Sequence, residues 1–105
     1  MATQIQSGTN YYGINYFNAN TSGWTLLGST GTRQFIVLIT FPVQFASIPA
    51  VQVGLTSFDV LPGGSGMQLD VQATDPSITG FYLQMTAWEC CKVMGLGVSW
   101  LAVAA

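Results

Sequence analysis

The side chains that could do chemistry are few, because only 6% of this 105-residue chain is charged, against about 25% in an average globular protein. The chain has no histidine, which excludes serine–histidine and cysteine–histidine catalysis and histidine-based metal sites. A pair of carboxylates can hydrolyse a glycosidic bond, but Asp59 and Asp75 lie beside turn signals, where aspartate is common. We therefore expect no catalytic residue, no metal site and no cofactor. The charged residues are Arg33, Lys92, Asp59, Asp70, Asp75 and Glu89.

The charge balance also excludes two kinds of partner. Two cations cannot neutralise several phosphates, so nucleic-acid binding is not expected. The longest apolar stretch, Val93–Ala105, is shorter than the roughly 20 residues of a spanning helix, so we expect no membrane insertion. The net charge is only −2 and the mean hydropathy is +0.45, so few charges keep the apolar surface from associating with other molecules. We expect part of that surface to be buried against other copies of the chain.

The N-terminus and the cysteines bear on the compartment. Met1-Ala2-Thr3-Gln4 lacks the basic start and apolar run of a signal peptide. We expect a cytoplasmic protein, or one that is released without a standard signal peptide. Cys90 and Cys91 are adjacent and would point to opposite faces of a strand, so they are not expected to bridge each other. Two free thiols in a reducing compartment is the first interpretation, and an intermolecular bridge is the alternative.

The elements that must position these residues are strands. Met67–Thr74 alternates apolar and polar residues, as a strand does with one face on a core and one in water. No long helical periodicity is present, and turn signals separate the strand-like segments. This pattern predicts a single all-β domain over residues 1–105, an antiparallel β-sandwich. The other expected strands are Thr3–Gly8, Gly23–Leu27, Gln34–Phe41, Val51–Phe58, Gly80–Trp88 and Val93–Val103.

Two of these strands, Gln34–Phe41 and Val93–Val103, carry apolar residues on both faces. One face of each strand in a two-sheet sandwich should be wet. The second apolar face therefore indicates a contact between subunits.

The segment Asn10–Asn20 is unusually rich in asparagine and tyrosine. Amide, hydroxyl and carboxylate groups beside an aromatic face suit a neutral polar ligand such as a sugar. Two other interpretations stay open, a turn-rich surface loop and a tyrosine-lined subunit contact.

The order of short motifs along the chain resembles the H-type lectin domain, the family of the snail agglutinins and of the C-terminal domain of the discoidins. The motifs that carry the resemblance are Ile5-Gln6-Ser7-Gly8, Gly23-Trp24, Ile39-Thr40-Phe41, Pro49-Ala50-Val51, Leu55-Thr56-Ser57-Phe58-Asp59-Val60, Thr79-Gly80-Phe81, Thr86-Ala87-Trp88 and Val98-Ser99-Trp100-Leu101-Ala102. The resemblance implies a six-stranded antiparallel β-sandwich that assembles into trimers, sometimes stacked into hexamers. It also implies sugar sites near the junctions between protomers.

Carried over residue by residue, the family's sugar site falls on seven positions of this sequence: Gly28, Ser29, Thr30, Asp70, Trp88, Glu89 and Met94. The glycine and the tryptophan are retained. Thr30 stands where the family has aspartate, Asp70 where it has arginine, and Glu89 where it has histidine. Met94 takes the place of an aromatic residue that the neighbouring protomer contributes. The N-acetylgalactosamine specificity of the family therefore does not follow from the resemblance.

The resemblance implies a multivalent lectin whose partners are the glycans of glycoproteins or glycolipids. Carboxylates at Asp70 and Glu89 would repel anionic sugars, so we expect neutral terminal galactose or N-acetylgalactosamine and no catalysis. The alternative is a trimerisation or host-attachment tip module with a degenerate sugar site. A second hypothesis places the sugar on the Asn10–Asn20 segment instead of the carried-over site.

Overall fold

Six β-strands account for the regular structure of the part of the chain that the computed structural model describes, residues 3–14, 16–17, 19–28, 31–60, 69–88 and 92–105. They are β1 (Gln4–Gly13), β2 (Arg33–Thr40), β3 (Ala50–Val60), β4 (Leu69–Thr74), β5 (Gly80–Ala87) and β6 (Val93–Ala104). No helix long and apolar enough to cross a membrane occurs within these residues.

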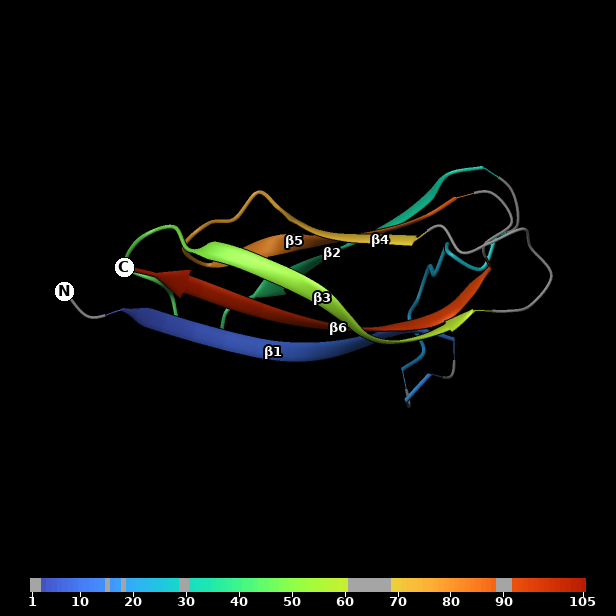
Figure 1. The fold of residues 1–105 in the computed structure, drawn as a ribbon, viewed down its shortest axis with the longest axis horizontal. Helices are drawn as coiled ribbons and strands as arrows, with labels where there is room; N and C mark the ends of the chain where they lie inside the picture. Colours follow the sequence, from blue (N-terminus) through green and yellow to red (C-terminus); the bar gives the residue numbers. More distant parts are fainter. Residues whose placement is uncertain (1–2, 15, 18, 29–30, 61–68, 89–91) are drawn as a thin grey trace.

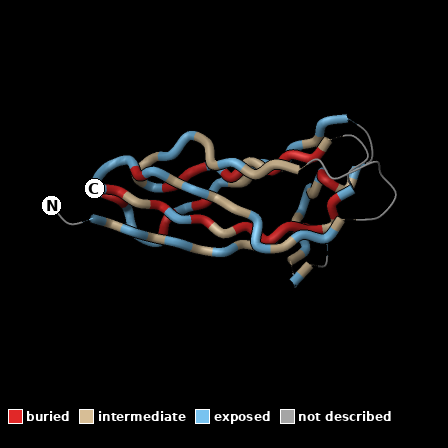
Figure 2. Tube along the Cα trace, in the orientation of Figure 1, coloured by how far each residue is buried: buried red, intermediate tan, exposed pale blue. Residues whose placement is uncertain are grey.

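The strands form two three-stranded sheets, in the orders β1-β6-β3 and β2-β5-β4, and every neighbouring pair is antiparallel (Figure 1). β1 begins where β6 ends, because Gln4 pairs with Ala104. The central strands, β5 and β6, are the most buried, as the red segments of Figure 2 show. The structure thus confirms the all-β class and the six-stranded antiparallel sandwich that the resemblance implied.

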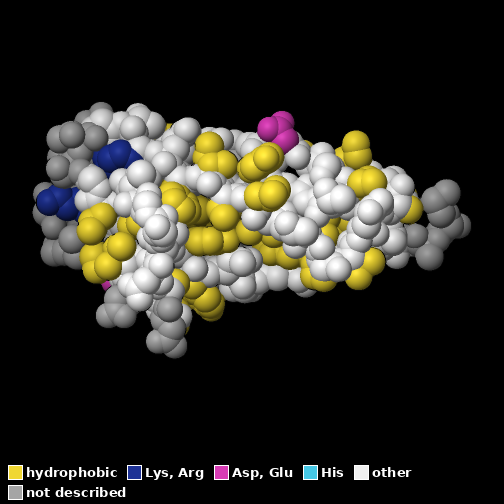
Figure 3. Space-filling view, turned by 180° about the vertical axis from the view of Figure 1, so that it is seen from behind, with side chains coloured by type: hydrophobic (Ala, Val, Ile, Leu, Met, Phe, Trp, Pro, Cys, Tyr) yellow, Lys and Arg dark blue, Asp and Glu magenta, His cyan; other side chains and the backbone are white. Residues whose placement is uncertain are grey.

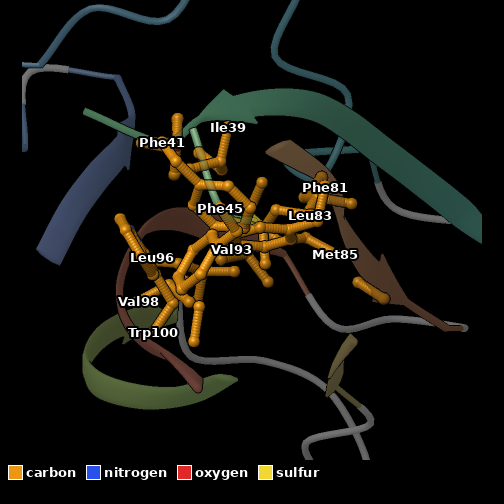
Figure 4. Packing of buried hydrophobic residues seen from close by; sticks show 14 of the residues in the cluster. Ile39, Phe41, Phe45, Phe81, Leu83, Met85, Val93, Leu96, Val98 and Trp100 are labelled. Carbon is orange, nitrogen blue, oxygen red and sulfur yellow. The ribbon is translucent and has the colours of Figure 1, made fainter. Parts of the chain in front are cut away.

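An aromatic cluster fills the core between the sheets (Figure 4). Phe41 lies at its centre, with ring centroids 4.8 Å from Phe45, 5.8 Å from Phe81 and 5.6 Å from Trp100. The Trp100 indole N–H donates a 3.2 Å hydrogen bond to the Asn10 side-chain oxygen, so its one polar atom has a partner. Inward-facing residues of β4 pack against this core, as the alternation over Met67–Thr74 predicts for the described positions Leu69, Val71 and Ala73.

One expected strand is wrong. Gly23–Leu27 is an irregular segment with turns, not a strand. Its strand-forming side chains serve as anchors: Leu26 is fully buried, and Trp24 packs on Phe35 with ring centroids 5.2 Å apart. The backbone of this segment does not pair with a neighbouring strand. Residues of high β-propensity therefore do not form a strand here.

The other expected strands are confirmed with shifted ends. β1 runs five residues past the expected end at Gly8, to Gly13, and β3 extends to Val60. β5 ends at Ala87, one residue before the expected end. The start of the expected strand Met67–Thr74, at Met67 and Gln68, lies outside the described residues.

The second apolar faces are present, but not along the whole of both strands. On the outer face of β2, Ile36 and Leu38 are 52% and 54% exposed. On the outer face of β6, Leu101 is 41% exposed. Gly95 and Gly97 of the same face are buried, because the chain's own Tyr16 and Tyr11 lie over them. Only the C-terminal half of β6 therefore offers apolar surface to another copy.

Candidate functional site

One end of the sandwich gathers the carried-over residues that the structure describes. Cross-strand pairing aligns Arg33 with Ala87 and Ala87 with Leu69, so β2 and β4 begin where β5 ends. In the other sheet Val60 pairs with Val93, which places the start of β6 beside the end of β3. This end, the right-hand end of Figure 1, is called the loop end below. It holds Gly28, Asp70, Trp88 and Met94.

The segment before Gly28 is fastened to β6. The Trp24 indole N–H donates to the Val93 carbonyl at 2.8 Å, and the Val93 N–H donates to the Leu26 carbonyl at 2.9 Å. Gly28 itself is exposed, and a Cβ at this position would lie 2.9 Å from the Cδ of Arg33. A larger residue would therefore displace the arginine side chain. The glycine that the resemblance carries over has a local steric reason to be there.

Asp70 faces outward from β4, in a cross-strand row with Thr86 of β5 and Gln34 of β2. Its carboxylate accepts a 2.8 Å hydrogen bond from the side-chain amide of Gln72, two residues along the same strand face. Thr86 beside it is only 3% exposed. Asp70 is half-buried on the edge strand β4. The hydrogen bond from Gln72 holds the orientation of its carboxylate.

Trp88 and Met94 belong to different sheets at the same end of the sandwich. Trp88 follows the last residue of β5 and is half-buried. Met94 lies on β6, and its carbonyl accepts a 2.8 Å hydrogen bond from the Ile14 N–H. One protomer therefore puts Asp70 and Trp88 on one sheet and Met94 on the other. Ser29, Thr30 and Glu89 of the expected site, and the adjacent Cys90 and Cys91, lie outside the described residues.

The few charges are also unevenly distributed. Arg33, Lys92, Asp59 and Asp70 all lie near the strand ends that form the loop end. The Lys and Arg side chains gather at this one end in Figure 3. Asp75 lies at the opposite end, in the turn between β4 and β5, with a positive φ of 50°. Asp75 is therefore a turn residue, as expected, because aspartate tolerates a positive φ better than most residues.

Two hollows on the described surface lie away from the carried-over residues. One, of about 250 Å³, lies over β3 and β6 and is lined in part by Gln52, Gly54 and Leu101. The other, of about 460 Å³, lies near the start of β1, beside Ile5 and Val43. Both are shallow and open. Among the described residues, no group of three or more Asp, Glu, Cys or His side chains could hold a metal ion.

Burial changes the ionisation of one tyrosine, Tyr12. It faces the core, is 9% exposed, and its ring lies 6.5 Å from that of Phe35. Burial raises the pKa of the Tyr12 phenol to about 12, because the charged form loses its hydration. Tyr12 is therefore neutral at physiological pH and has a packing role.

A second feature of the loop end is an exposed aromatic group formed by Tyr11, Tyr16 and Phe17, called the aromatic platform below. Phe17 contacts both tyrosines, with ring centroids 4.7 Å from Tyr11 and 4.8 Å from Tyr16. The sequence analysis singled out the segment Asn10–Asn20, which contains all three rings, but it did not connect this segment with the glycines beneath the tyrosines. The signal was available as Gly95 and Gly97, which interrupt an otherwise apolar strand.

A comparison with protein families matches the H-type lectin domain over residues 36–103. That range includes Asp70, Trp88, Glu89 and Met94, and it begins after Gly28, Ser29 and Thr30.

Two similar proteins are "ATP synthase subunits region ORF 7" of Fuscovulum blasticum and Discoidin-2 of Dictyostelium discoideum. The first is 29% identical over 80 residues, which cover 76% of this chain and 66% of that protein. The second is 28% identical over 79 residues, 75% of this chain and 31% of that protein. Two solved structures of discoidin II from Dictyostelium discoideum superimpose with TM-scores of 0.78 and 0.79 at 25% identity. They cover 96% and 98% of this chain, but this chain spans only 36% and 37% of theirs.

Proposed function

The chain belongs to the H-type lectin domain family, and from this premise we propose that it is a multivalent lectin for neutral glycans that end in galactose or N-acetylgalactosamine. A lectin family points to binding rather than catalysis. The observation that carries the proposal is the row at the loop end in which Asp70 faces outward, close to the retained Trp88. The proposed contacts are Gly28, Ser29, Thr30, Asp70, Trp88 and Glu89 of one protomer and Met94 of its neighbour.

The chemistry of this row supports a neutral ligand. A half-buried carboxylate accepts hydrogen bonds from sugar hydroxyls, and charge-assisted bonds of this kind are the stronger ones. The indole of Trp88 offers a face for the apolar C–H side of a pyranose ring. A sulfate or sialic acid carboxylate at the same place would meet the negative charge of Asp70. Asp59 adds a second carboxylate at the same end.

The exposed apolar residues support multivalency. Ile36, Leu38 and Tyr82 lie on the outer face of the β2-β5-β4 sheet, whereas Ile5 and Leu101 lie on the outer face of the other sheet. Two different patches on opposite sides suit a head-to-tail contact, and such contacts form a ring when the rotation between subunits closes. A trimer, or a hexamer of two stacked trimers, would present several weak sites at once and gain avidity.

Glycan binding by the whole assembly tests the proposal. The protein should bind arrayed neutral galactosides and agglutinate red cells, and free galactose should inhibit the agglutination. Asp70→Asn should weaken galactoside binding about ten-fold or more, because a hydrogen bond to a charged group is lost. Asp75→Asn, the same change at the opposite end, is the matched control and should bind like the wild type. A clear preference for sialylated or sulfated glycans would contradict the proposal.

The alternative is a trimerisation or host-attachment tip module with a degenerate sugar site. Three departures from the family pattern favour it, at Thr30, Asp70 and Glu89. The same glycan array discriminates between the two. A protein that sediments as a trimer but binds none of the arrayed glycans would be the structural module.

A further inference from the structure

The aromatic platform is held in place by its own loop. The loop closes at its base through two 2.8 Å hydrogen bonds, Thr21 N–H to the Gly13 carbonyl and Gly13 N–H to the Thr21 hydroxyl. Two further bonds join Tyr16 and Ala19, at 3.0 and 2.7 Å, and set Phe17 at the tip. Figure 1 shows this light-blue segment after β1 projecting away from the sheets. The rings are therefore displayed by a fastened loop.

Two glycines of β6 provide the seats for the tyrosines. A Cβ on Gly95 would lie 2.3 Å from the Cγ of Tyr16, and a Cβ on Gly97 would lie 2.9 Å from the Cε1 of Tyr11. Neither tyrosine could occupy its position over a larger residue. Phe17 then packs against both rings and is itself 64% exposed. At Gly97 the side chains of Ser57 and Thr56 also lie close to the position of a Cβ, so that glycine makes room for all three neighbours.

The exposure and backbone of Phe17 argue against a purely structural role. Its φ is 47°, a left-handed conformation that is rare for a bulky residue and more often taken by glycine or asparagine. Folding alone would gain more from placing a large apolar ring in the core than at an exposed tip. Strained residues that display a side chain cluster at ligand sites.

Polar acceptors stand next to the rings. Ser57 pairs with Gly97 across the strands, and its hydroxyl is buried without a hydrogen-bond partner in the structure. Asp59 pairs with Gly95 on the same outer face and is exposed. The Ser57 hydroxyl is out of reach of a ligand, so Asp59 is the acceptor that a sugar can meet. An aromatic surface with a neighbouring exposed carboxylate matches the two sides of a sugar ring, its C–H face and its hydroxyl edge.

We propose that Tyr11, Tyr16 and Phe17 form a stacking platform for a neutral pyranose ring, with Asp59 accepting hydrogen bonds from its hydroxyls. This is a sugar subsite separate from the carried-over positions around Asp70, and it rests on the proposed lectin function. The platform lies on the β1-β6-β3 sheet, whereas Asp70 and Trp88 lie at the end of the other sheet.

The test is an NMR titration of the full chain with methyl β-galactoside, and with 3′-sialyllactose as the anionic comparison. The ring signals of Tyr11 and Phe17 should shift with the neutral sugar, and they should still shift in Asp70→Asn. Phe17→Asn deletes the ring and suits the positive φ, and it should weaken binding at the platform about three- to ten-fold. Combining Phe17→Asn with Tyr11→Thr should abolish it.

Two further variants separate the platform from general surface effects. Ile48→Asn removes an apolar side chain that is 65% exposed, against 64% for Phe17, and that lies far from the platform. This variant should bind like the wild type. Gly95→Ala keeps every ring but pushes Tyr16 off its seat, and it should weaken platform binding while leaving the Asp70 site unchanged.

The outcomes distinguish this inference from the proposed function. A wild-type protein that binds no galactoside would contradict both. Galactoside binding that leaves the Tyr11 and Phe17 signals unmoved, and that Phe17→Asn does not weaken, would overturn the platform alone. The same holds if Tyr11→Thr dissociates the oligomer without changing sugar binding, because the rings would then form a subunit contact.

Discussion

The molecule contains two groups of aromatic rings that differ in what surrounds them. Phe41, Phe45, Phe81 and Trp100 pack between the sheets and are at most 6% exposed. Tyr11, Tyr16 and Phe17 make ring contacts of similar length at the loop end, yet Phe17 is 64% exposed. Ring contacts at such distances therefore do not by themselves indicate a core.

The difference shows which aromatic residues the fold requires. Each buried ring gains free energy by leaving water, and the glycine beneath Trp100, Gly8, exists to admit that ring. The exposed rings also have glycine seats, but they leave much of their area in water. A chain with this little charge has a solubility reason to avoid exposed rings. Their presence is better explained by a ligand than by folding.

The largest expected effect is on the buried group. Phe81→Ala should lower the free energy of unfolding by about 3–5 kcal/mol, because it deletes a fully buried ring and leaves a cavity among Phe41 and Trp100. Urea titration monitored by tryptophan fluorescence measures this. If Phe81→Ala lowered the free energy of unfolding by less than about 1 kcal/mol, the buried rings would not have the structural role that distinguishes them from the exposed ones.

A smaller effect is expected on the pH dependence of stability, and it comes from Tyr12. Tyr12 faces the core, whereas its neighbour Tyr11 points to the opposite face of β1. Because the folded pKa of Tyr12 is about 12 and a free tyrosine ionises near 10, the unfolded chain loses this proton first. The contribution of the neutral Tyr12 phenol to the free energy of unfolding is fully present below pH 10, and it is lost as the pH rises towards 12. At pH 11 the loss should be at most about 1.4 kcal/mol, since one pKa unit corresponds to 1.36 kcal/mol.

Urea midpoints at pH 9 and pH 11 measure this effect, with Tyr12→Phe as the comparison. The variant has no phenol to ionise at this position, so it should lose less stability between the two pH values. Equal losses in both proteins would show that Tyr12 is not shielded from water, and would weaken the contrast between the two faces of β1.

The fold could be predicted from the sequence better than the site. Alternation in β4 and the apolar runs of β2 and β6 follow directly from which face meets the core, so the sequence predicts the ends of β2 and β6 within one residue and the end of β4 at Thr74. Gly23–Leu27 was misassigned because its tryptophan and leucines look the same in sequence whether they join a ladder or anchor a loop. Gly95 and Gly97 are visible as interruptions of an apolar strand, but the rings that lie over them come from a loop some 80 residues away in sequence, and local patterns do not show which residues those are.

The smallest expected effect concerns the stability of Phe17→Asn. The substitution removes ring contacts with Tyr11 and Tyr16, worth about 0.5–1.5 kcal/mol each when well packed and less in water. It also relieves a positive φ that costs a bulky residue about 1 kcal/mol or more. These terms oppose each other, so the free energy of unfolding should change by less than about 1 kcal/mol. Thermal melts of the variant and the wild type measure it. A loss as large as that of Phe81→Ala would place Phe17 with the structural rings, whereas an unchanged melt together with weaker sugar binding would separate the platform's function from the fold.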